Sequence, residues 1–182
     1  MKRKTAKEIL AESFRELAQK KAADKITVKE IADNCGYSVA TFYRQFNDKY
    51  DLVAWDYARD IDDILKGIDG NYPSWQQALL TASEYYIKNR EYLANLLKHT
   101  SGYDSFVRYM TEIDNNIFRE TVLNASALKE LDESTKIYIR IYILGTVNIT
   151  CEWILGQFEA TPEEMAEIYE NALPLPLKQY LY

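Results

Sequence analysis

The sequence predicts an all-α protein with an N-terminal three-helix helix-turn-helix domain and a C-terminal helical bundle. Apolar residues recur at intervals of three and four along nearly the whole chain, and no run alternates with the period of two that marks a strand. Only 6 Gly and 4 Pro occur in 182 residues, too few for a turn-rich β protein. The hydrophobic fraction of 47% is ample for a packed core.

The first helices are marked by their caps. Apolar residues between Ala6 and Leu17 follow helical spacing, and a polar connection comes after them. Thr27 and Glu30 then form a capping box, in which the threonine hydroxyl accepts from an amide of the first turn and the glutamate reaches back. The helix that they open ends at Gly36, because glycine readily takes the left-handed conformation of a C-terminal cap.

Two more helices precede a loop. Ser38 can cap a helix that runs to Phe46, and Asp48 caps a fourth helix that runs to about Gly67. Glycines and a proline between residues 67 and 73 mark the loop. Beyond it, the apolar period predicts helices over residues 74–89, 90–99, 103–123, 134–158 and 162–173.

Charge is divided unevenly along the chain. Residues 1–50 contain 11 Lys and Arg against 7 Asp and Glu, a net of +4, whereas residues 51–182 have a net charge of −10. The first part attracts phosphates and the second repels them. This asymmetry suits a protein that docks on nucleic acid in one orientation.

The sequence contains no signal for secretion or membrane insertion. Three of its first five residues are basic, but charged residues follow where a signal peptide has an apolar run. No stretch approaches the roughly 20 apolar residues of a membrane helix. We therefore expect a cytoplasmic protein with no membrane partner.

The usual motifs of catalysis and metal binding are missing. Cys35 and Cys151 lie far apart in apolar contexts, so each is expected to be a small buried hydrophobe. His99 is the only histidine, and no cysteine or carboxylate is spaced to join it at a metal. The sequence also lacks a Gly-rich phosphate loop and a nucleophile elbow. We expect no enzyme activity, no cofactor and no metal.

The segment from Thr27 to Phe46 has the length and spacing of a helix-turn-helix. The second helix of such a pair enters the DNA major groove, which requires small or hydrogen-bonding residues near its start. Spacing alone also fits a plain helical hairpin. Residues of the required kind stand at Tyr37, Ser38, Ala40, Thr41 and Arg44.

The same segment resembles the DNA-binding signature of the TetR family of regulators, over about residues 5–55 without a gap. The resemblance implies a TetR-like fold, and it implies that Thr27, Tyr43 and Lys49 grip phosphates. It also implies that Tyr37, Ser38, Ala40, Thr41 and Arg44 face base edges or the adjacent backbone. The landmarks are Thr27-Val28-Lys29-Glu30-Ile31-Ala32, Gly36-Tyr37-Ser38, Thr41-Phe42-Tyr43-Arg44-Gln45-Phe46 and Lys49-Tyr50-Asp51-Leu52.

Each of these assignments has a structural alternative. Tyr43 is also explained as surface padding, and Arg44 as a solvated charge. Thr27 has a role as an N-cap in any case, although a helix N-terminus can also hold a phosphate. Val39 and Ala40 replace the polar residue and glycine often seen in relatives. Base reading is therefore expected to lean on Arg44 and on contact with thymine methyl groups.

The C-terminal part predicts how two copies pair. Residues 150–156 and 160–166 resemble a TetR subgroup linked to dihydroxyacetone kinase operons, which includes a co-activator that works beside another protein. The helix over residues 134–158 is apolar nearly all round, so it must bury two faces. In the TetR family the last two helices of each copy form the dimer interface; a central core helix in a monomer is the alternative. The interface residues expected are Ile141, Leu144, Gly145, Ile149, Trp153 and Ile168.

Aromatic residues are abundant in the middle of the chain. Aromatic side chains with polar tips suit a ligand cavity, although they equally suit a packed core. Arg108 lies next to Tyr109 on a helix expected to face inward, and it is the charge expected to meet an acidic ligand. The candidate ligand-binding residues are Trp75, Tyr85, Tyr86, Tyr103, Arg108 and Tyr109.

Together these features predict a two-domain regulator, with a DNA-binding domain over residues 1–50 and a ligand-sensing and dimerisation domain over residues 51–182. The favoured function is a ligand-responsive repressor that binds double-stranded DNA as a homodimer. The alternative is a co-regulator of the same fold that acts through a protein partner. A small-molecule effector is expected in the first case and a bound protein in the second.

Overall fold

The computed structural model describes residues 4–66, 74–102, 105–126 and 129–182 of the chain. These residues form helices and connections, with no strand in the ranges given, which confirms the all-α class. The helices are α1 (Ala6–Ala18), α2 (Val28–Asn34), α3 (Val39–Tyr43), α4 (Lys49–Lys66), α5 (Trp75–Lys88), α6 (Arg90–His99), α7 (Phe106–Ala125), α8 (Glu133–Ile154), α9 (Pro162–Ala172) and α10 (Leu175–Leu181), with a 3-10 turn η1 (Ala23–Lys25).

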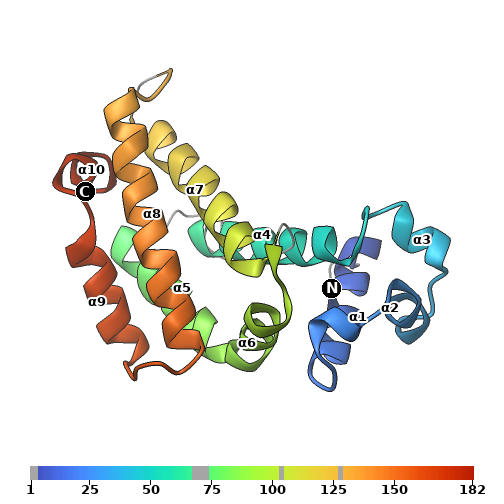
Figure 1. Cartoon of the computed structure of the whole chain (residues 1–182). Helices are drawn as coiled ribbons and strands as arrows, with labels where there is room; N and C mark the ends of the chain where they lie inside the picture. The colour runs from blue at the N-terminus through green and yellow to red at the C-terminus, as the bar shows by residue number, and fades with distance from the viewer. Residues whose placement is uncertain (1–3, 67–73, 103–104, 127–128) are drawn as a thin grey trace.

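Helix α4 joins the two ends of the molecule. Helices α1, α2 and α3 gather at one end, which we call the head, and α5 and α7 to α10 lie in the part that we call the body (Figure 1). The start of α4 lies at the head, and α4 contacts α1 there as well as α5 and α7 in the body. Any change in the tilt of α4 is therefore shared by both parts.

The predicted caps of the head helices are present. Thr27 and Glu30 form the capping box at the start of α2, and Asp48 accepts hydrogen bonds from the first amides of α4. Gly36 has a φ of 73° and ends α2 as expected. Its N–H donates to Asp33 O at 3.2 Å, and the N–H of Tyr37 donates to Ala32 O at 2.9 Å. This pair of bonds is a Schellman motif, which turns the chain sharply into the segment before α3.

The end of α8 differs from the prediction. The apolar period runs to Phe158, but α8 ends at Ile154. Gly156 has a φ of 76°, and its N–H donates to Trp153 O while the N–H of Gln157 donates to Glu152 O, both at 3.0 Å. Phe158 still packs on the core, from the connection that follows. A partly buried side chain in the connection therefore extended the apolar period beyond the end of the helix.

Helix α10 was missed because prolines flank its start and it spans only 7 residues. Proline is tolerated in the first turn of a helix, and so short a segment shows no clear apolar period. Its Leu177 is buried in the core. The loop predicted between residues 67 and 73 lies outside the described residues. Within the described ranges, no helix combines the length and hydropathy needed to cross a membrane.

Buried polar contacts attach the head to the body. The α4 carboxylate of Asp56, 1% exposed, accepts from Arg15 Nε on α1 at 2.5 Å, and Arg15 also pairs with Asp60. Burial raises the pKa of Asp56, although the Arg15 charge acts in the opposite direction. Breaking such a pair leaves an uncompensated buried charge. The orientation of α1 on α4 is therefore strongly specified.

Helix α6 holds the connection between α1 and α2. The side chain of Asn95 donates to the carbonyls of Ala18 and Lys21 at 2.6 and 2.8 Å, and it accepts from the N–H of Ala23 at 2.9 Å. One side chain thereby satisfies three backbone groups that have no helical partner. This contact fastens the connection between α1 and α2 to α6.

Candidate nucleic-acid interface and ligand cavity

Two buried phenylalanines hold α3 in place. Phe42 and Phe46 are fully or almost fully buried, and their ring centroids lie 5.8 Å apart. Trp55 of α4 lies 5.7 Å from the ring of Phe46. Such aromatic contacts bury large areas with defined geometry. The inner side of α3 is thus fixed, and its other side faces outward.

The outward side of α3 carries a hydrogen-bonded row. Ser38 Oγ caps the helix by accepting from the N–H of Thr41 at 3.1 Å, and the two hydroxyl oxygens lie 3.0 Å apart. Arg44 Nη2 donates to Thr41 Oγ1 at 2.9 Å. Ser38, Ala40 and Arg44 are exposed, and Thr41 is half-buried. The row offers donors and acceptors of the kind that read base edges.

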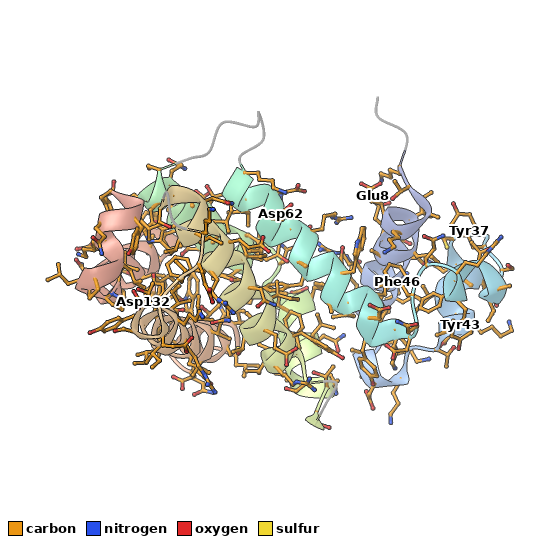
Figure 2. The ribbon with its side chains drawn as sticks, turned by 90° about the horizontal axis from the view of Figure 1, so that it is seen from above. Glu8, Tyr37, Tyr43, Phe46, Asp62 and Asp132 are labelled. Atoms are coloured by element: carbon orange, nitrogen blue, oxygen red, sulfur yellow. The ribbon has the colours of Figure 1, made fainter. Side chains whose placement is uncertain are left out.

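Two tyrosines flank this row. Figure 2 shows Tyr37 and Tyr43 at the end of the molecule opposite Asp132. Tyr43 is 57% exposed, and its ring meets Phe42 edge-on at 5.6 Å. Tyr37 follows the Gly36 turn and is half-buried. Tyrosine hydroxyls in such positions commonly contact phosphates.

Thr27 is exposed at the start of α2 and works as its cap. Its Oγ1 accepts from the N–H of Glu30 at 3.2 Å and donates to the Glu30 carboxylate at 2.8 Å. The ammonium of Lys21 lies 2.6 Å from the same carboxylate. The Lys21 hydrogen bond, followed by those from Thr27, lowers the pKa of Glu30 to about 2. The cap therefore stays intact throughout the physiological pH range.

Lys49 is held by the backbone of the head. Its Nζ donates to the carbonyls of Ala23, Asp24 and Ile26 at 2.8 to 2.9 Å, which occupies all three ammonium hydrogens. Its pKa is lowered, chiefly by burial. The start of α4 is thereby fastened to the connection between α1 and α2. A phosphate at Lys49 would share its hydrogens with these carbonyls.

A cavity of about 90 Å³ lies inside the body. Helices α4, α5, α7, α8 and α9 all contribute to its walls, which are mainly aliphatic and aromatic. A larger hollow of about 420 Å³ adjoins it between α4, α5, α7 and α10. The two spaces share the side chains of Leu65, Trp75, Ala78 and Ile117.

A half-buried carboxylate stands in the cavity wall. Asp114 of α7 accepts from the hydroxyl of Tyr57 of α4, which lies 2.9 and 3.0 Å from its two oxygens. The Tyr57 and Tyr86 hydroxyls lie 3.1 Å apart. Burial raises the pKa of Asp114 to about 7, against the lowering effect of the Tyr57 hydrogen bond. A carboxyl group that changes charge near neutral pH is typical of functional sites.

The predicted ligand residues are not all at this cavity. Trp75 and Tyr86 line it, whereas Tyr85 and Tyr109 are not among the lining residues. Arg108 was expected to point inward, and this was wrong: it is exposed and donates to Glu112 at 2.8 Å. The buried stripe of α7 runs through Phe106, Met110, Phe118 and Val122, and Arg108 lies away from it. Tyr103 lies outside the described residues.

Asp114 was missed by the sequence analysis, although the sequence contains a signal for it. Met110, Asp114 and Phe118 are spaced by four, so the acidic residue lies on the apolar stripe of its helix. An acidic residue on a buried stripe is uncommon unless it has a partner. Tyr57 was not identifiable, because its partner lies 57 residues away in the sequence.

Helix α8 presents an unpaired apolar face in the single chain. Ile141 is 60% exposed, and Ile168 of α9 is 51% exposed. Trp153 was expected at the dimer interface, and this was wrong. It is 1% exposed in the single chain, and its Nε1 donates to Ala160 O at 3.1 Å. The remaining predicted interface residues are all exposed: Ile141, Leu144, Gly145, Ile149 and Ile168.

The cysteines and the histidine form no metal-binding cluster with acidic residues in the ranges that the structure covers. Cys151 is buried, and burial raises its pKa to about 12. A thiol in this state is a poor nucleophile and metal ligand. Cys35 is half-buried at the end of α2.

Comparison with known families matches both parts of the chain. Residues 9–54 match the family described as bacterial regulatory proteins, tetR family. Residues 73–174 match a family described as transcriptional regulator C-terminal region, which alone covers more than half of the chain. Both descriptions are of transcriptional regulators.

Known relatives agree with these matches. The HTH-type dhaKLM operon transcriptional activator DhaS of Lactococcus lactis subsp. lactis (strain IL1403) is 23% identical over 128 residues, which are 69% of this chain and 68% of that protein. The structure of a dihydroxyacetone kinase operon activator DhaS is similar with a TM-score of 0.63 and 20% identity, over 96% of this chain and 95% of that one. A TetR transcriptional regulator from Rhodococcus sp. RHA1 has a TM-score of 0.66 and 18% identity, over 95% and 93%.

Proposed function

The chain belongs to the TetR family of transcriptional regulators, and on this premise we propose that it is a homodimeric, ligand-responsive repressor. The observation that carries the proposal is the row of Ser38, Thr41 and Arg44. This row is presented to solvent on α3, while Phe42 anchors the same helix from beneath. Two such helices in a dimer would enter successive major grooves about 34 Å apart.

We assign different roles to the residues of the head. Tyr37, Ser38, Ala40, Thr41 and Arg44 contact base edges or the neighbouring backbone. A second set, Thr27, Tyr43 and Lys49, contacts phosphates and sets the register on DNA. The net charge of +4 over residues 1–50 supports this orientation, because the acidic remainder of the chain is repelled by DNA.

Dimer formation uses the exposed face of α8. Its aliphatic residues lie on one side of the helix, and Ile168 of α9 adds to the apolar surface. Exposed apolar patches of this kind mark interaction sites in soluble proteins. Adding a Cβ at Gly145 would meet no atom within 4 Å, so the backbone of α8 is open to close approach by a second copy.

The effector site in this proposal is the cavity in the body. Tyr57, whose hydroxyl donates to Asp114 in the cavity wall, lies on the helix that begins at Lys49 in the head. A ligand that prefers one tilt of α4 changes the spacing of the two α3 helices in the dimer. By linkage, DNA weakens ligand binding by the same factor that the ligand weakens DNA binding.

Substitution of Arg44 tests the proposed function. Arg44→Ala is expected to cost about 1–3 kcal/mol at particular base pairs of the operator, because a bidentate base contact contributes this much to discrimination. Arg119→Ala on α7 removes the same charge from an exposed site in the body and serves as the control. Binding is measured by fluorescence anisotropy on operator and random DNA. Equal losses on both DNAs would refute a reading role for Arg44.

A second candidate function is that of a co-regulator acting through a protein partner. The observation that favours it is the likeness to a protein named as an operon activator. The exposed α8 face would then receive a different protein instead of a second copy. Purification from the native host distinguishes the two: a stoichiometric heterologous partner favours the co-regulator, and a homodimer favours the repressor.

A further inference from the structure

The hydroxyl hydrogens on one side of the cavity are already used. With Asp114 ionised, the Tyr57 hydroxyl donates its only hydrogen to the carboxylate. The bond between Tyr57 and Tyr86, at 3.1 Å, must then use the hydrogen of Tyr86. What these three groups still offer to a ligand is lone pairs on oxygen.

The same holds on the α8 side of the cavity. Thr146 Oγ1 donates to Tyr142 O at 2.9 Å, and Thr150 Oγ1 donates to Thr146 O at 2.8 Å. The hydroxyls of Thr150 and Tyr169 lie 2.6 Å apart, so this bond uses the hydrogen of Tyr169. The Tyr142 hydroxyl donates to Tyr169 O at 2.9 Å. Every hydroxyl of the described cavity wall therefore has its hydrogen committed.

The charges around Asp114 leave it without a cation. No Lys, Arg or His is among the described residues that line the cavity. The titratable groups that face Asp114 are Tyr57 of α4, Tyr86 of α5 and Cys151 of α8, and none of them carries a positive charge. Trp75 contributes an indole N–H, which is buried without a hydrogen bond near the Tyr142 hydroxyl. It supplies a donor but no compensating charge.

We propose that this cavity binds a small primary ammonium compound, whose N–H groups donate to the Asp114 carboxylate and to the neighbouring tyrosine oxygens. This inference rests on the proposed function, because it names the effector of the same site. The volume of about 90 Å³ is smaller than that of a protein cavity of about 150 Å³ that binds benzene, so it suits a ligand smaller than benzene. A chain of about three to five non-hydrogen atoms meets this limit. While Asp114 is ionised, carboxylates and phosphates are disfavoured, because they would meet another anion with no cation among the described lining residues.

The same contact explains how an ammonium ligand bound in the body affects the head. Its N–H groups donate to the free lone pairs of Asp114, and their positive charge weakens the hydrogen bond that the carboxylate accepts from Tyr57. Weakening this hydrogen bond loosens the contact between α4 and α7, and α4 begins at the head. The ligand thus acts on the helix that positions α3.

Calorimetric titration of the full chain with three ligands of equal size tests the proposal. The ligands are n-propylamine, 1-propanol and propionate, each at pH 8. We expect the amine to bind at least tenfold more tightly than the alcohol, and propionate not to bind. Equal or tighter binding of the alcohol or of propionate would overturn the proposal, and so would the absence of binding by all three.

Two further measurements tie binding to Asp114. Asp114→Asn keeps the shape and removes the charge, so amine affinity is expected to fall at least tenfold, whereas Glu112→Gln on the exposed side of α7 changes nothing. Lowering the pH from 8 to 6 is expected to weaken amine binding by about tenfold, because the carboxylate becomes protonated. This second measurement stays decisive if the variant fails to fold. Amine affinity that ignores both pH and Asp114→Asn would contradict the proposed site.

Mobility shift of the unliganded protein on operator DNA separates this inference from the proposed function. DNA binding without amine binding overturns the ammonium site alone. Amine binding without DNA binding overturns the proposed function and leaves the ligand class standing.

Discussion

Individual residues of the head combine folding and binding roles. Lys49 is the clearest case, because its ammonium donates hydrogen bonds to three backbone carbonyls in the connection that follows α1. The resemblance to TetR proteins implies a phosphate contact for this residue. In the structure it also attaches the start of α4 to the connection between α1 and α2. Thr27 is similar, since its hydroxyl is committed to the capping box.

Lys49→Ala is expected to lower the free energy of unfolding by about 1–3 kcal/mol, because it leaves partly buried carbonyls without donors. It should also weaken binding to all DNA sequences and flatten the salt dependence, because one phosphate contact is lost. Urea denaturation and anisotropy at several salt concentrations measure the two effects. Unchanged stability together with an unchanged salt slope would contradict both roles.

Asp114 gives the body a distinctive pH dependence. Its pKa is about 7 in the folded chain and near 3.8 when unfolded, so the folded state holds a proton that the unfolded state has lost. The stability from this group is present at low pH and is lost as the pH rises toward 7. Between pH 5 and pH 7 we expect a loss of about 2 kcal/mol.

Asp114→Asn should abolish this loss. The difference between the unfolding curves of the wild type and the variant, measured by urea denaturation at each pH, isolates the Asp114 contribution. Parallel stability profiles between pH 5 and pH 7 would show that the carboxyl group is not perturbed.

At the scale of elements, helix ends matter as much as helix faces. Gly156 ends α8 with a φ of 76°, and a Cβ added there would lie 3.0 Å from Arg90 Nη2. Gly156→Ala is expected to lower the free energy of unfolding by about 1–2 kcal/mol, because the left-handed conformation is unfavourable for alanine. Glu152→Ala is the control, since it places alanine at an exposed helical position of α8 outside the predicted interface. Thermal denaturation that ranks the two variants equally would contradict the assigned role of Gly156.

The sequence predicts elements well where the information is local. The capping box at Thr27 and the turn at Gly36 depend on neighbouring residues, and both are found as predicted. The end of α8 was misplaced, because the apolar period at Phe158 outweighed the glycine before it. Trp153 was misassigned because periodicity does not say whether an apolar face meets its own chain or another.

The candidate sites also differ in how far local sequence predicts them. The surface of α3 was predictable, because Ser38, Thr41 and Arg44 follow from one short motif. The cavity was not, because it is built from five helices whose packing no single segment encodes. Arg108 was placed inward on the strength of a neighbouring tyrosine, whereas the acidic residue on the actual buried stripe, Asp114, was overlooked.

At the scale of the whole molecule, the apolar face of α8 is exposed in the single chain. The exposed face of α8 is expected to pair with its copy, so Ile141→Glu should convert the dimer to a monomer by burying a charge at the interface. Leu175→Glu introduces the same charge at an exposed position outside α8, 79% exposed, and should leave the dimer intact. Sedimentation velocity measures both. A dimer that survives Ile141→Glu would require another interface.

The basic head and the acidic body also predict a single docking orientation. Residues 1–50 carry +4 and residues 51–182 carry −10, so only the α1–α3 end of each copy is attracted to DNA. In the proposed function, a ligand bound in the body changes the tilt of α4, and this change alters the position of α3. The proposed regulatory function therefore depends on one event, the binding of α3 to duplex DNA.

A mobility-shift assay with the DNA that flanks the chain's own gene tests this event most directly. We expect a discrete complex of one dimer per site at physiological salt, which survives an excess of random DNA. Arg44→Ala should lose this preference while keeping its weak binding to random DNA. A purified dimer that fails to bind any duplex, even at low salt, would contradict the proposed DNA-binding role of α3.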